Sequence, residues 1–347
     1  MKSSETPKPK VWATFDPVPS VVEYLKSHAD FSYNETSQLA SRDMLLRQMP
    51  DLDGLFVTLR DQVDGGLIEK AARLKVISTL SVGYDGIDIA AATKRGIWVT
   101  NTPDVLTDAT ADLAWALLLA VARRIPESDR LVRSGGYSGW RHTLMLGTEL
   151  SGKTLGIWGA GRIAQAIARR AQGFDMKIIY NNRSRKPDFE RQVRADFVEF
   201  PDLLRQSDFL VLAVPLNDES RNRIGRTEFD LMKRSAFLIN IARGAIIREE
   251  EMVEALRQKR IAGAGLDVYV DTSGIHKKLG GLDHVVLTPH IGSATVETRE
   301  KMTVLAAQGI VDVLQGRRPV HAVNDLETGE FGEALERFAH EVSGEVL

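Results

Sequence analysis

A glycine-rich segment, TLGIWGAGRIAQAIARRA, is the first part of the chain whose residue types suggest chemistry. It carries the pattern G-x-G-x-x-A at Gly159, Gly161 and Ala164, directly after an apolar run typical of a strand and at the start of a helical pattern. The first glycine permits a tight turn, the second lets the backbone approach a pyrophosphate, and the alanine keeps the helix close to the sheet. The N–H groups near Arg162 and Ile163 would then face the phosphates at a helix N-terminus. We therefore predict a dinucleotide site, in preference to a glycine-rich turn that binds nothing.

The end of the next apolar run, IIYNNRSRKP, indicates which dinucleotide is bound. An NAD site places an acidic residue about 20 positions after the glycine loop, where it binds the ribose hydroxyls. This chain has Asn182 there, followed by Arg183, Ser184, Arg185 and Lys186. No carboxylate would repel a 2′-phosphate, and arginines can pair with one. The segment therefore favours NADP over NAD as the cofactor. The alternative interpretation is a solvated basic loop that binds no ligand.

Two further residues could carry the reaction itself. Arg243 lies just after the apolar run FLINI, in a turn with Gly244, and His290 follows the run HVVLTP. Ligands of parallel sheets bind at the carboxyl ends of strands. An arginine there can hold a carboxylate through two hydrogen bonds, although either residue alone could be an ordinary structural one. With a cofactor loop in the same chain, they predict that Arg243 binds the carboxylate of a 2-oxo acid while His290 protonates its carbonyl as a hydride arrives.

These residues need a framework of parallel strands. Short β-branched runs alternate with amphipathic helical patterns, which predicts an α/β fold. The expected strands are 10–15, 54–58, 74–80, 96–100, 153–159, 177–181, 209–214, 236–241, 262–268 and 284–289. Helices are expected between the first strands, for example at 37–48, and then at 107–124, 161–172, 201–206, 249–258 and 294–315. We expect Thr107 or Asp108 to cap the long helix that begins there.

The alternation breaks at the loop SGGYSGW, so we predict two doubly wound parallel-sheet domains, Rossmann-like or flavodoxin-like, with a cleft between them. The helix at 294–315 has no strand after it and is expected to pack back on the first domain. The predicted division is 8–104 with 293–325 for substrate binding, 105–292 for dinucleotide binding, and a C-terminal tail at 326–347. The tail has apolar residues near helical spacing and could dock on a partner subunit.

The composition narrows the classes of function. A net charge of -2 over 347 residues gives no electrostatic reason to expect nucleic acid or a membrane surface as a partner. The chain has no cysteine, which excludes disulfides, thiolate nucleophiles and zinc–thiolate sites, and we expect no metal. The polar start MKSSETPKPK lacks the apolar stretch of a signal peptide. The longest apolar run, LAWALLLAVA, is too short to span a bilayer. We expect a cytoplasmic protein.

Taken together, these motifs resemble the D-isomer-specific 2-hydroxyacid dehydrogenases, and within them the glyoxylate/hydroxypyruvate reductase branch. The resemblance covers about residues 50 to 325. It is carried, in chain order, by LSVGYDGIDIAAATKRGIWVTNTPDVLTDATADLAWALLL, GWR, GAGRIAQAIARR, NRSRKP, NIARGA, GAGLDV and LTPHIGSAT. Several independent motifs in order are more specific than any one of them.

The resemblance implies roles for individual residues. The backbone at Val82 and Gly83 would bind the substrate carboxylate, and Arg243 would align carboxylate and carbonyl. His290 would be the general acid in reduction and the base in oxidation, and Asp267 would orient the nicotinamide carboxamide. We further assign Thr110, Pro215 and Ile241 to the cofactor site, Ser293 to the substrate pocket, and Trp140 to a position that reaches the neighbouring subunit's site. The resemblance also implies a homodimer built around the helix 107–124 and the loop after it, and a discontinuous first domain.

The clearest departure from the family lies five positions after Asp267. Family members carry a glutamate there, which hydrogen-bonds the catalytic histidine, raises its pKa and fixes its tautomer. This chain has Thr272, followed by Ser273. Asp271 could serve His290 if the loop shifts, although it is one methylene shorter and a neighbouring side chain tends to point the other way. Alternatively, Thr272 keeps a weaker hydrogen bond, which would lower activity and move its pH optimum to lower pH. A third interpretation is a family member that regulates or runs a different reaction, since the family contains non-metabolic corepressors.

We predict an NADPH-dependent reductase of small 2-oxo acids, glyoxylate or hydroxypyruvate by resemblance, which gives D-2-hydroxy acids. The alternatives are an NADP-binding regulatory protein, a different reaction on the same scaffold, or an interaction module with an unused nucleotide fold. A change in melting temperature with NADPH would separate the last from the others, since a ligand that binds only the folded state must stabilise it.

Overall fold

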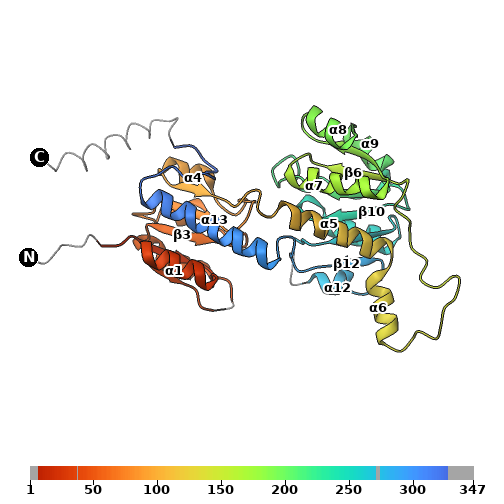
Figure 1. Cartoon of the computed structure of the whole chain (residues 1–347), viewed down its shortest axis with the longest axis horizontal. Helices are drawn as coiled ribbons and strands as arrows, with labels where there is room; N and C mark the ends of the chain where they lie inside the picture. Colours follow the sequence, from red (N-terminus) through yellow and green to blue (C-terminus); the bar gives the residue numbers. More distant parts are fainter. Residues whose placement is uncertain (1–6, 37, 271–273, 327–347) are drawn as a thin grey trace, which may run out of the picture. The chain divides into compact units, whose positions relative to one another are not determined.

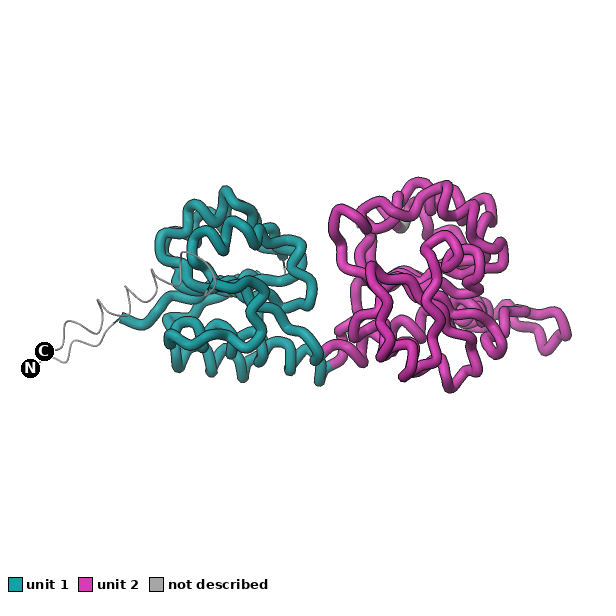
Figure 2. The backbone as a smooth tube through the Cα atoms, turned by 90° about the horizontal axis from the view of Figure 1, so that it is seen from above, with its two compact units in different colours: residues 1–105, 296–347 teal, residues 106–295 magenta. Residues whose placement is uncertain are grey.

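The protein is described by a computed structural model that covers residues 7–36, 38–270 and 274–326. Two compact units account for these residues (Figure 2). Unit 1 takes the described residues of 1–105 and 296–347, and unit 2 takes those of 106–295. Unit 1 is therefore built from two separate stretches of the chain, and unit 2 is inserted between them.

Unit 1 contains a five-stranded parallel sheet in the order β2-β1-β3-β4-β5. This is the flavodoxin-like doubly wound order. Its elements are β1 (Lys10–Ala13), α1 (Pro19–His28), β2 (Asp30–Tyr33), α2 (Arg42–Gln48), the short 3-10 helix η1 (Met49–Asp51), β3 (Gly54–Val57), α3 (Gly65–Ile68), β4 (Val76–Thr79), α4 (Ile89–Lys94), β5 (Trp98–Thr100) and α13 (Val296–Leu314). Apolar residues of α2, α3 and α4 pack with one face of this sheet.

Helix α13 returns to unit 1 after the chain has built unit 2, and it lies beside α1 (Figure 1). The Ser78 hydroxyl on β4 donates a hydrogen bond to the carbonyl of Ala306, at 3.0 Å. A Cβ on Gly54 would lie 3.3 Å from a methyl of Ile310, so the helix packs directly on β3. The small residues on this face allow the close approach of helix and sheet.

Unit 2 contains a seven-stranded parallel sheet in the order β12-β11-β10-β9-β6-β7-β8. When β6 is counted as strand 1 and the later strands follow in chain order, the sheet reads 3-2-1-4-5-6 from β8 to β11. This is the strand order of the Rossmann fold. Its elements are α5 (Thr107–Ala122), α6 (Ile125–Arg133), β6 (Thr154–Trp158), α7 (Arg162–Ala171), η2 (Gln172–Phe174), β7 (Lys177–Asn181), α8 (Pro187–Val193), β8 (Ala195–Phe197), α9 (Phe200–Gln206), β9 (Phe209–Leu212), α10 (Arg226–Leu231), β10 (Phe237–Asn240), η3 (Gly244–Ile246), α11 (Glu249–Arg257), β11 (Gly263–Leu266), α12 (Ile275–Leu279) and β12 (Val285–Leu287).

Alternate residues of these strands face two different cores. Ile178 and Tyr180 pack with α5, α7 and α8, whereas Ile179 packs with α9, α10 and α11. The same alternation follows β9 and β10. Strands buried on both faces read as continuous apolar runs, which is why they were visible in the sequence.

The structure also corrects several expectations. The edge strands β2 and β8 and the helices α6, α8, α10 and α12 were not expected from the sequence, whereas α1, α3 and α4 lie between the first strands, where helices were expected without bounds. Edge strands are short and carry polar residues, so they lack the apolar run that marks a central strand. The helix expected from 37 begins at Arg42, where the Ser41 side chain accepts a hydrogen bond from the Met44 N–H at 3.2 Å.

The predicted cap of the long helix was wrong. Helix α5 begins at Thr107, but its N-cap is Leu106, which makes no side-chain cap hydrogen bond. Asp108 instead forms an ion pair with Arg170 of α7, at 3.2 Å. The side chain thus joins two neighbouring helices, a contact that local sequence does not indicate.

Candidate active site

Six strands of unit 2 end in one row. In the strand registers, Trp158 pairs with Asn181 and Leu212, and the row continues through Asn240, Leu266 and Leu287. The next residue of each strand therefore starts a loop at the same edge of the sheet. These loops hold the glycine pattern, the basic segment, the Arg243 turn, Asp267 and His290, which are far apart in the sequence.

The glycine loop lies where the strand order reverses, between β6 and β9. Gly159 has a backbone angle φ of 116°, which residues other than glycine rarely adopt. A Cβ on Gly159 would lie 2.5 Å from the carbonyl oxygen of Ala213, just after β9. In open α/β sheets, this point of reversal is where ligands bind.

The residues after Gly159 fit a pyrophosphate. Gly161 is the N-cap of α7 and makes no side-chain cap hydrogen bond. A Cβ placed on Gly161 would meet nothing within 4 Å, so the backbone faces open space there. The first N–H groups of a helix have no partner within the helix, and Arg162 and Ile163 carry the first two of α7. Ala164 is fully buried and keeps α7 against the sheet. An anion in that space would meet backbone donors and the positive end of the helix.

The basic loop after β7 is arranged by a tyrosine and a glutamate. The Tyr180 hydroxyl accepts a hydrogen bond from the Lys186 N–H and donates one to Glu190, both at 2.7 Å. Glu190 also binds Arg185 through both carboxylate oxygens, at 2.8 and 3.1 Å. Arg185 is therefore already paired, and its guanidinium holds the pKa of Glu190 below its usual range.

The other arginine of this loop remains available. Arg183 is exposed and has no ion-pair partner among the residues that the structure describes. Asn182 donates a hydrogen bond to the carbonyl of Ser184 at 2.9 Å, which closes a small turn around Arg183. The two arginines that looked equivalent in the sequence thus differ in what they can bind.

The turn that carries Arg243 is built around a buried asparagine. Asn240 is fully buried; its amide oxygen accepts from the Ala242 N–H at 3.1 Å and its amide nitrogen donates to the carbonyl of Arg243 at 3.0 Å. A Cβ on Gly244 would come within 2.1 Å of the backbone of Tyr269, so only glycine lets the turn lie against the segment that follows β11. Arg243 is half-buried, and one of its nitrogens donates to the carbonyl of Ala242 at 2.8 Å.

Asp267 lies next to the loop that carries His290. It is 1% exposed, and its carboxylate accepts hydrogen bonds from the N–H groups of Ile291 and Gly292, at 2.8 and 2.9 Å. A Cβ on Gly292 would lie 3.3 Å from Asp267 and 3.4 Å from Thr110, so the first turn of α5 reaches the same place. Asp267 and Thr110 are thus brought together by the loop of residues 288–292, although they were assigned from separate motifs.

In unit 1, the backbone at Val82 and Gly83 forms a polar loop after β4. The Ser81 hydroxyl donates to the carbonyl of Gly83, and the Asn101 amide donates to the carbonyl of Val82 at 2.8 Å. Within the described part of the chain, the N–H groups of Val82 and Gly83 donate no hydrogen bond. Two neighbouring free donors suit a carboxylate.

The remaining predicted positions are more scattered. Ile241 is buried just past the end of β10, and Pro215 is exposed, with its carbonyl accepting a hydrogen bond from Ser220 at 2.7 Å. Ser293 follows Gly292 and is half-buried, while Trp140 is 81% exposed on the segment after α6. Asp271 and Thr272, the two candidates for the partner of His290, lie outside the described residues.

Some residues of this edge were not predicted. Asn240, Tyr269 and Thr288 hold the turns that carry Arg243 and His290. Asn240 could have been found, because it is the one polar residue that ends the apolar run FLI before the Arg243 turn. Tyr269 and Thr288 have no such signal, since their partners come from another strand.

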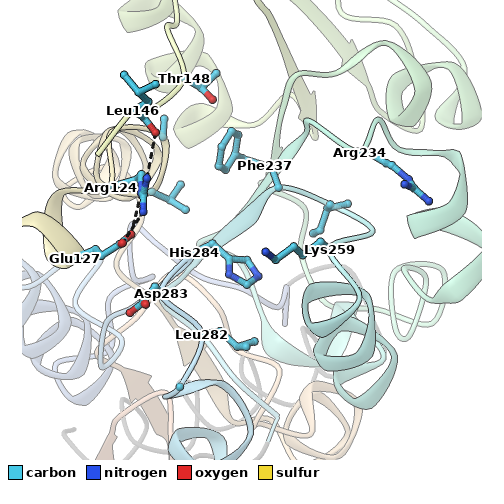
Figure 3. Close-up of a pocket in the computed structure, with 16 residues that line it drawn as sticks. Arg124, Glu127, Leu146, Thr148, Arg234, Phe237, Lys259, Leu282, Asp283 and His284 are labelled. Atoms are coloured by element: carbon cyan, nitrogen blue, oxygen red, sulfur yellow. Dashed lines mark hydrogen bonds and ion pairs between the residues drawn. The ribbon is translucent and has the colours of Figure 1, made fainter. Parts of the chain in front are cut away.

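A cavity of about 620 Å³ lies at the opposite ends of these strands. Phe237 at the start of β10 and His284 just before β12 line it (Figure 3). Figure 3 shows His284 and Lys259 near its middle, with Arg124 and Glu127 at one wall. None of the predicted site residues lines this cavity.

Among the described residues, no group of three or more carboxylate or imidazole side chains is placed to bind a metal, and no helix is long and apolar enough to cross a bilayer.

The chain is similar to known proteins over most of its length. Residues 115–292 match the family model of the D-isomer specific 2-hydroxyacid dehydrogenase, NAD binding domain. A glyoxylate reductase of Thermococcus litoralis is 48% identical over 91% of this chain and 97% of its own length. The NADPH-dependent glyoxylate/hydroxypyruvate reductase of Sinorhizobium meliloti, solved with NADP and malonate, superposes with a TM-score of 0.81 at 29% identity, over 92% of this chain and 98% of that one. The D-lactate dehydrogenase of Aquifex aeolicus, solved with NAD and lactic acid, gives a TM-score of 0.80 at 26% identity, over 88% of this chain and 96% of that one.

Proposed function

Since the chain belongs to the D-isomer specific 2-hydroxyacid dehydrogenases, which are NAD(P)-dependent oxidoreductases, we propose that it reduces a small 2-oxo acid such as glyoxylate or hydroxypyruvate to the D-2-hydroxy acid. The observation that carries this proposal is the row of strand ends in unit 2. It brings the Arg243 turn and the His290 loop to the same sheet edge as the uncapped helix α7. Relatives named glyoxylate reductase support the substrate class.

Residues of unit 2 would hold the cofactor. The N–H groups of Arg162 and Ile163, at the start of α7, would bind a pyrophosphate in the open space beside Gly161. Asn182 and Ser184 lie beside Arg183 at the position expected for the ribose. When bound, the reduced nicotinamide supplies the hydride.

The reacting acid would be held by its carboxylate. The Arg243 guanidinium can form two parallel hydrogen bonds with a carboxylate. In unit 1, the N–H groups of Val82 and Gly83 are by themselves also suited to a carboxylate. His290, as imidazolium, would give its proton to the carbonyl oxygen as the hydride reaches the carbonyl carbon, and would take it back in the reverse reaction. Arg243 stabilises the same negative charge that grows on this oxygen.

Arg183 supports NADP as the preferred cofactor. It is exposed and unpaired in the described part of the chain, and the carboxylates that follow it, Asp188 and Glu190, are paired with Arg191 and Arg185. Relatives solved with NADP and with NAD both occur, so the choice rests on this chain's own loop.

The first test is an assay of NADPH and NADH oxidation with a panel of 2-oxo acids, followed by chiral analysis of the product. We expect turnover of glyoxylate or hydroxypyruvate with a preference for NADPH, and D-glycerate from hydroxypyruvate.

Arg183→Asp should lower kcat/KM for NADPH about 10–100-fold and leave kcat/KM for NADH almost unchanged, because it removes a charge-assisted hydrogen bond to the 2′-phosphate and adds repulsion.

Arg205→Asp is the matched control for that variant. Arg205 is an exposed arginine near the end of α9 that pairs with the similarly exposed Asp202. Helix α9 ends just before β9 begins, at the sheet edge opposite to the basic loop. The control makes the same change in net charge there, so the cofactor preference should not move. If Arg183→Asp behaves like the control, the 2′-phosphate is bound elsewhere. Absence of turnover with every acid would reject the reductase.

One observation favours a second function. At the position where the family carries the glutamate that supports the histidine, this chain has Thr272. A protein that binds NADPH, as seen by a rise in melting temperature, but reduces no 2-oxo acid would fit an NADP-binding regulatory role or a different reaction.

We also propose a homodimer formed through α6 and the segment after it (Figure 1). Large apolar side chains gather on this stretch with high exposure, namely Ile125, Val132, Tyr137, Trp140 and Leu146. Large exposed apolar side chains concentrated on one stretch of chain favour an interface. We expect light scattering to give twice the chain mass for the wild type and the single chain mass for Leu146→Asp. Val320→Asp, at a still more exposed apolar residue of unit 1, is the control and should stay dimeric. A monomeric wild type would reject the proposal.

A further inference from the structure

The backbone at His290 has a conformation that its surroundings must maintain. His290 has φ 57°, in the left-handed region that is unfavourable for residues with a side chain. It lies in the loop of residues 288–292, directly after β12. Such a conformation persists only where neighbouring contacts determine it, and it sets the direction in which the imidazole leaves the backbone.

Asp267 provides contacts on both sides of His290. Its Oδ1 accepts hydrogen bonds from the Thr288 hydroxyl at 2.6 Å and from the Ile291 N–H at 2.8 Å. Its Oδ2 accepts from the Gly292 N–H at 2.9 Å. The carboxylate is 1% exposed, and charged groups are rarely buried so far unless they are hydrogen-bonded. One buried side chain therefore joins the residues before and after the histidine.

The backbone of Thr288 is also held, by the end of β11 and by the residues that follow it. The Thr288 N–H donates to the carbonyl of Leu266 at 2.9 Å, and the Tyr269 hydroxyl donates to the carbonyl of Thr288 at 2.8 Å. Burial, and then the nearby Asp267 carboxylate, raise the pKa of Tyr269 to about 12, so this hydroxyl stays a donor at neutral pH. Thr288 is thus held by its N–H, its carbonyl and its hydroxyl.

From this geometry we infer that Asp267 and Thr288 are positioning residues for His290, acting through the backbone of the loop rather than through contact with the ring. The inference rests on the proposed function, in which His290 moves the proton. A carboxylate has about four acceptor positions, and three are used by the loop. A cofactor contact of Asp267 would use the remaining one.

The test uses Thr288, because it is assigned to neither cofactor nor substrate. Thr288→Val keeps the shape of the side chain and removes the hydroxyl, while Thr288→Ser keeps the hydroxyl. We expect Thr288→Val to lower kcat about 10–100-fold, since a displacement of about 1 Å in a reacting group has an effect of this size. The KM for NADPH should stay unchanged, and Thr288→Ser should restore most of kcat.

Thr303→Val is the matched control. Thr303 is a buried threonine of α13 in unit 1, whose hydroxyl donates to the carbonyl of Arg299 at 2.6 Å. The control loses a hydroxyl that donates a part-buried hydrogen bond, as Thr288→Val does, so it measures the general effect on stability. An unchanged kcat in Thr288→Val would overturn the inference. So would an equal loss in Thr288→Val and Thr288→Ser, because serine retains the bond to Asp267.

A second measurement separates this inference from the proposed function. The ring C–H signals of His290 can be followed by ¹³C–¹H spectroscopy of the full chain without any ligand, with His290→Asn as the assignment. We expect Thr288→Val to move these signals and Thr288→Ser to leave them near the wild-type position. If the wild type reduces no 2-oxo acid but the signals behave in this way, the reductase is rejected while the positioning of His290 stands. If the signals do not move, the positioning is rejected whatever the activity.

Discussion

His290→Asn is expected to lower kcat for 2-oxo acid reduction about 10²–10⁴-fold, because asparagine cannot give a proton to the carbonyl oxygen. Asparagine is the variant of choice since it tolerates the left-handed backbone found at this position, φ 57° in the wild type. The KM for NADPH should change little. Steady-state rates from pH 5 to 9 measure the effect, with the melting temperature as the check on folding.

The pH profile adds a second expectation for the same residue. Reduction needs the imidazolium, so the wild-type rate should fall as pH rises through the pKa of His290. A carboxylate beside the ring favours the charged form and would raise that pKa. Thr272→Glu should therefore extend the active range to higher pH. A wild type already fully active well above neutral pH would mean that another group, such as Asp271, supports the ring.

Two outcomes would contradict the assignment of His290. One is a His290→Asn enzyme that keeps more than a tenth of the wild-type kcat. The other is a large loss that is accompanied by an equally large fall in melting temperature, since the effect would then come from folding. The positive φ makes this second check necessary, because side chains that do not tolerate the left-handed region would strain the loop.

Arg243→Ala is expected to lower kcat/KM for the 2-oxo acid about 10²–10³-fold, with both a higher KM and a lower kcat. Hydrogen bonds to charged groups contribute about 1.5–3 kcal/mol each, and the guanidinium can make two with the substrate carboxylate. It acts on the bound acid and on the charge that grows during reduction, so both constants change. Arg243→Lys keeps the charge but lacks the planar fork, and we expect it to recover only part of the loss.

Arg248→Ala is the matched control for this prediction. Arg248 lies at the start of α11, close in sequence to Arg243, and its guanidinium contacts Glu251 at 3.5 Å and the carbonyl of Asn222 at 3.2 Å. The side chains of Arg248 and Glu251 are exposed and partly exposed, and ion pairs in such places contribute little to stability. Its kinetic constants should stay within about twofold of the wild type, on the scale of such surface pairs. An Arg243→Ala enzyme that resembles this control would show that another cation binds the substrate.

Local patterns were sufficient for the framework and for the identity of most candidate residues. Central parallel strands are buried on both faces, so each leaves an apolar run in the sequence, and the polar or glycine residues that follow mark where the strand ends. That is why Gly159, Arg183, Arg243 and His290 were each found at the end of a strand. The edge strands β2 and β8 were missed, because they are short and partly polar.

The pairing of side chains needed the tertiary structure. Arg183 and Arg185 are two residues apart and looked alike, but only Arg185 is bound by Glu190. Thr288 and Asp267 are separated by 21 positions, and their hydrogen bond exists because β11 and β12 lie side by side in register. Sequence shows the type of a side chain, whereas its partner depends on which strands become neighbours.

The same reasoning explains the glycines. The pattern G-x-G-x-x-A identified Gly159 and Gly161, because a known spacing carries its own physical explanation. Gly244 had no such pattern, and its necessity appears only when the Arg243 turn meets the backbone of Tyr269 within 2.1 Å of the Cβ position. The chemistry of this protein could thus be inferred from residue types at strand ends. The arrangement that orients Arg243 and His290 depends on contacts between strands, because those contacts are formed only when the sheet is assembled.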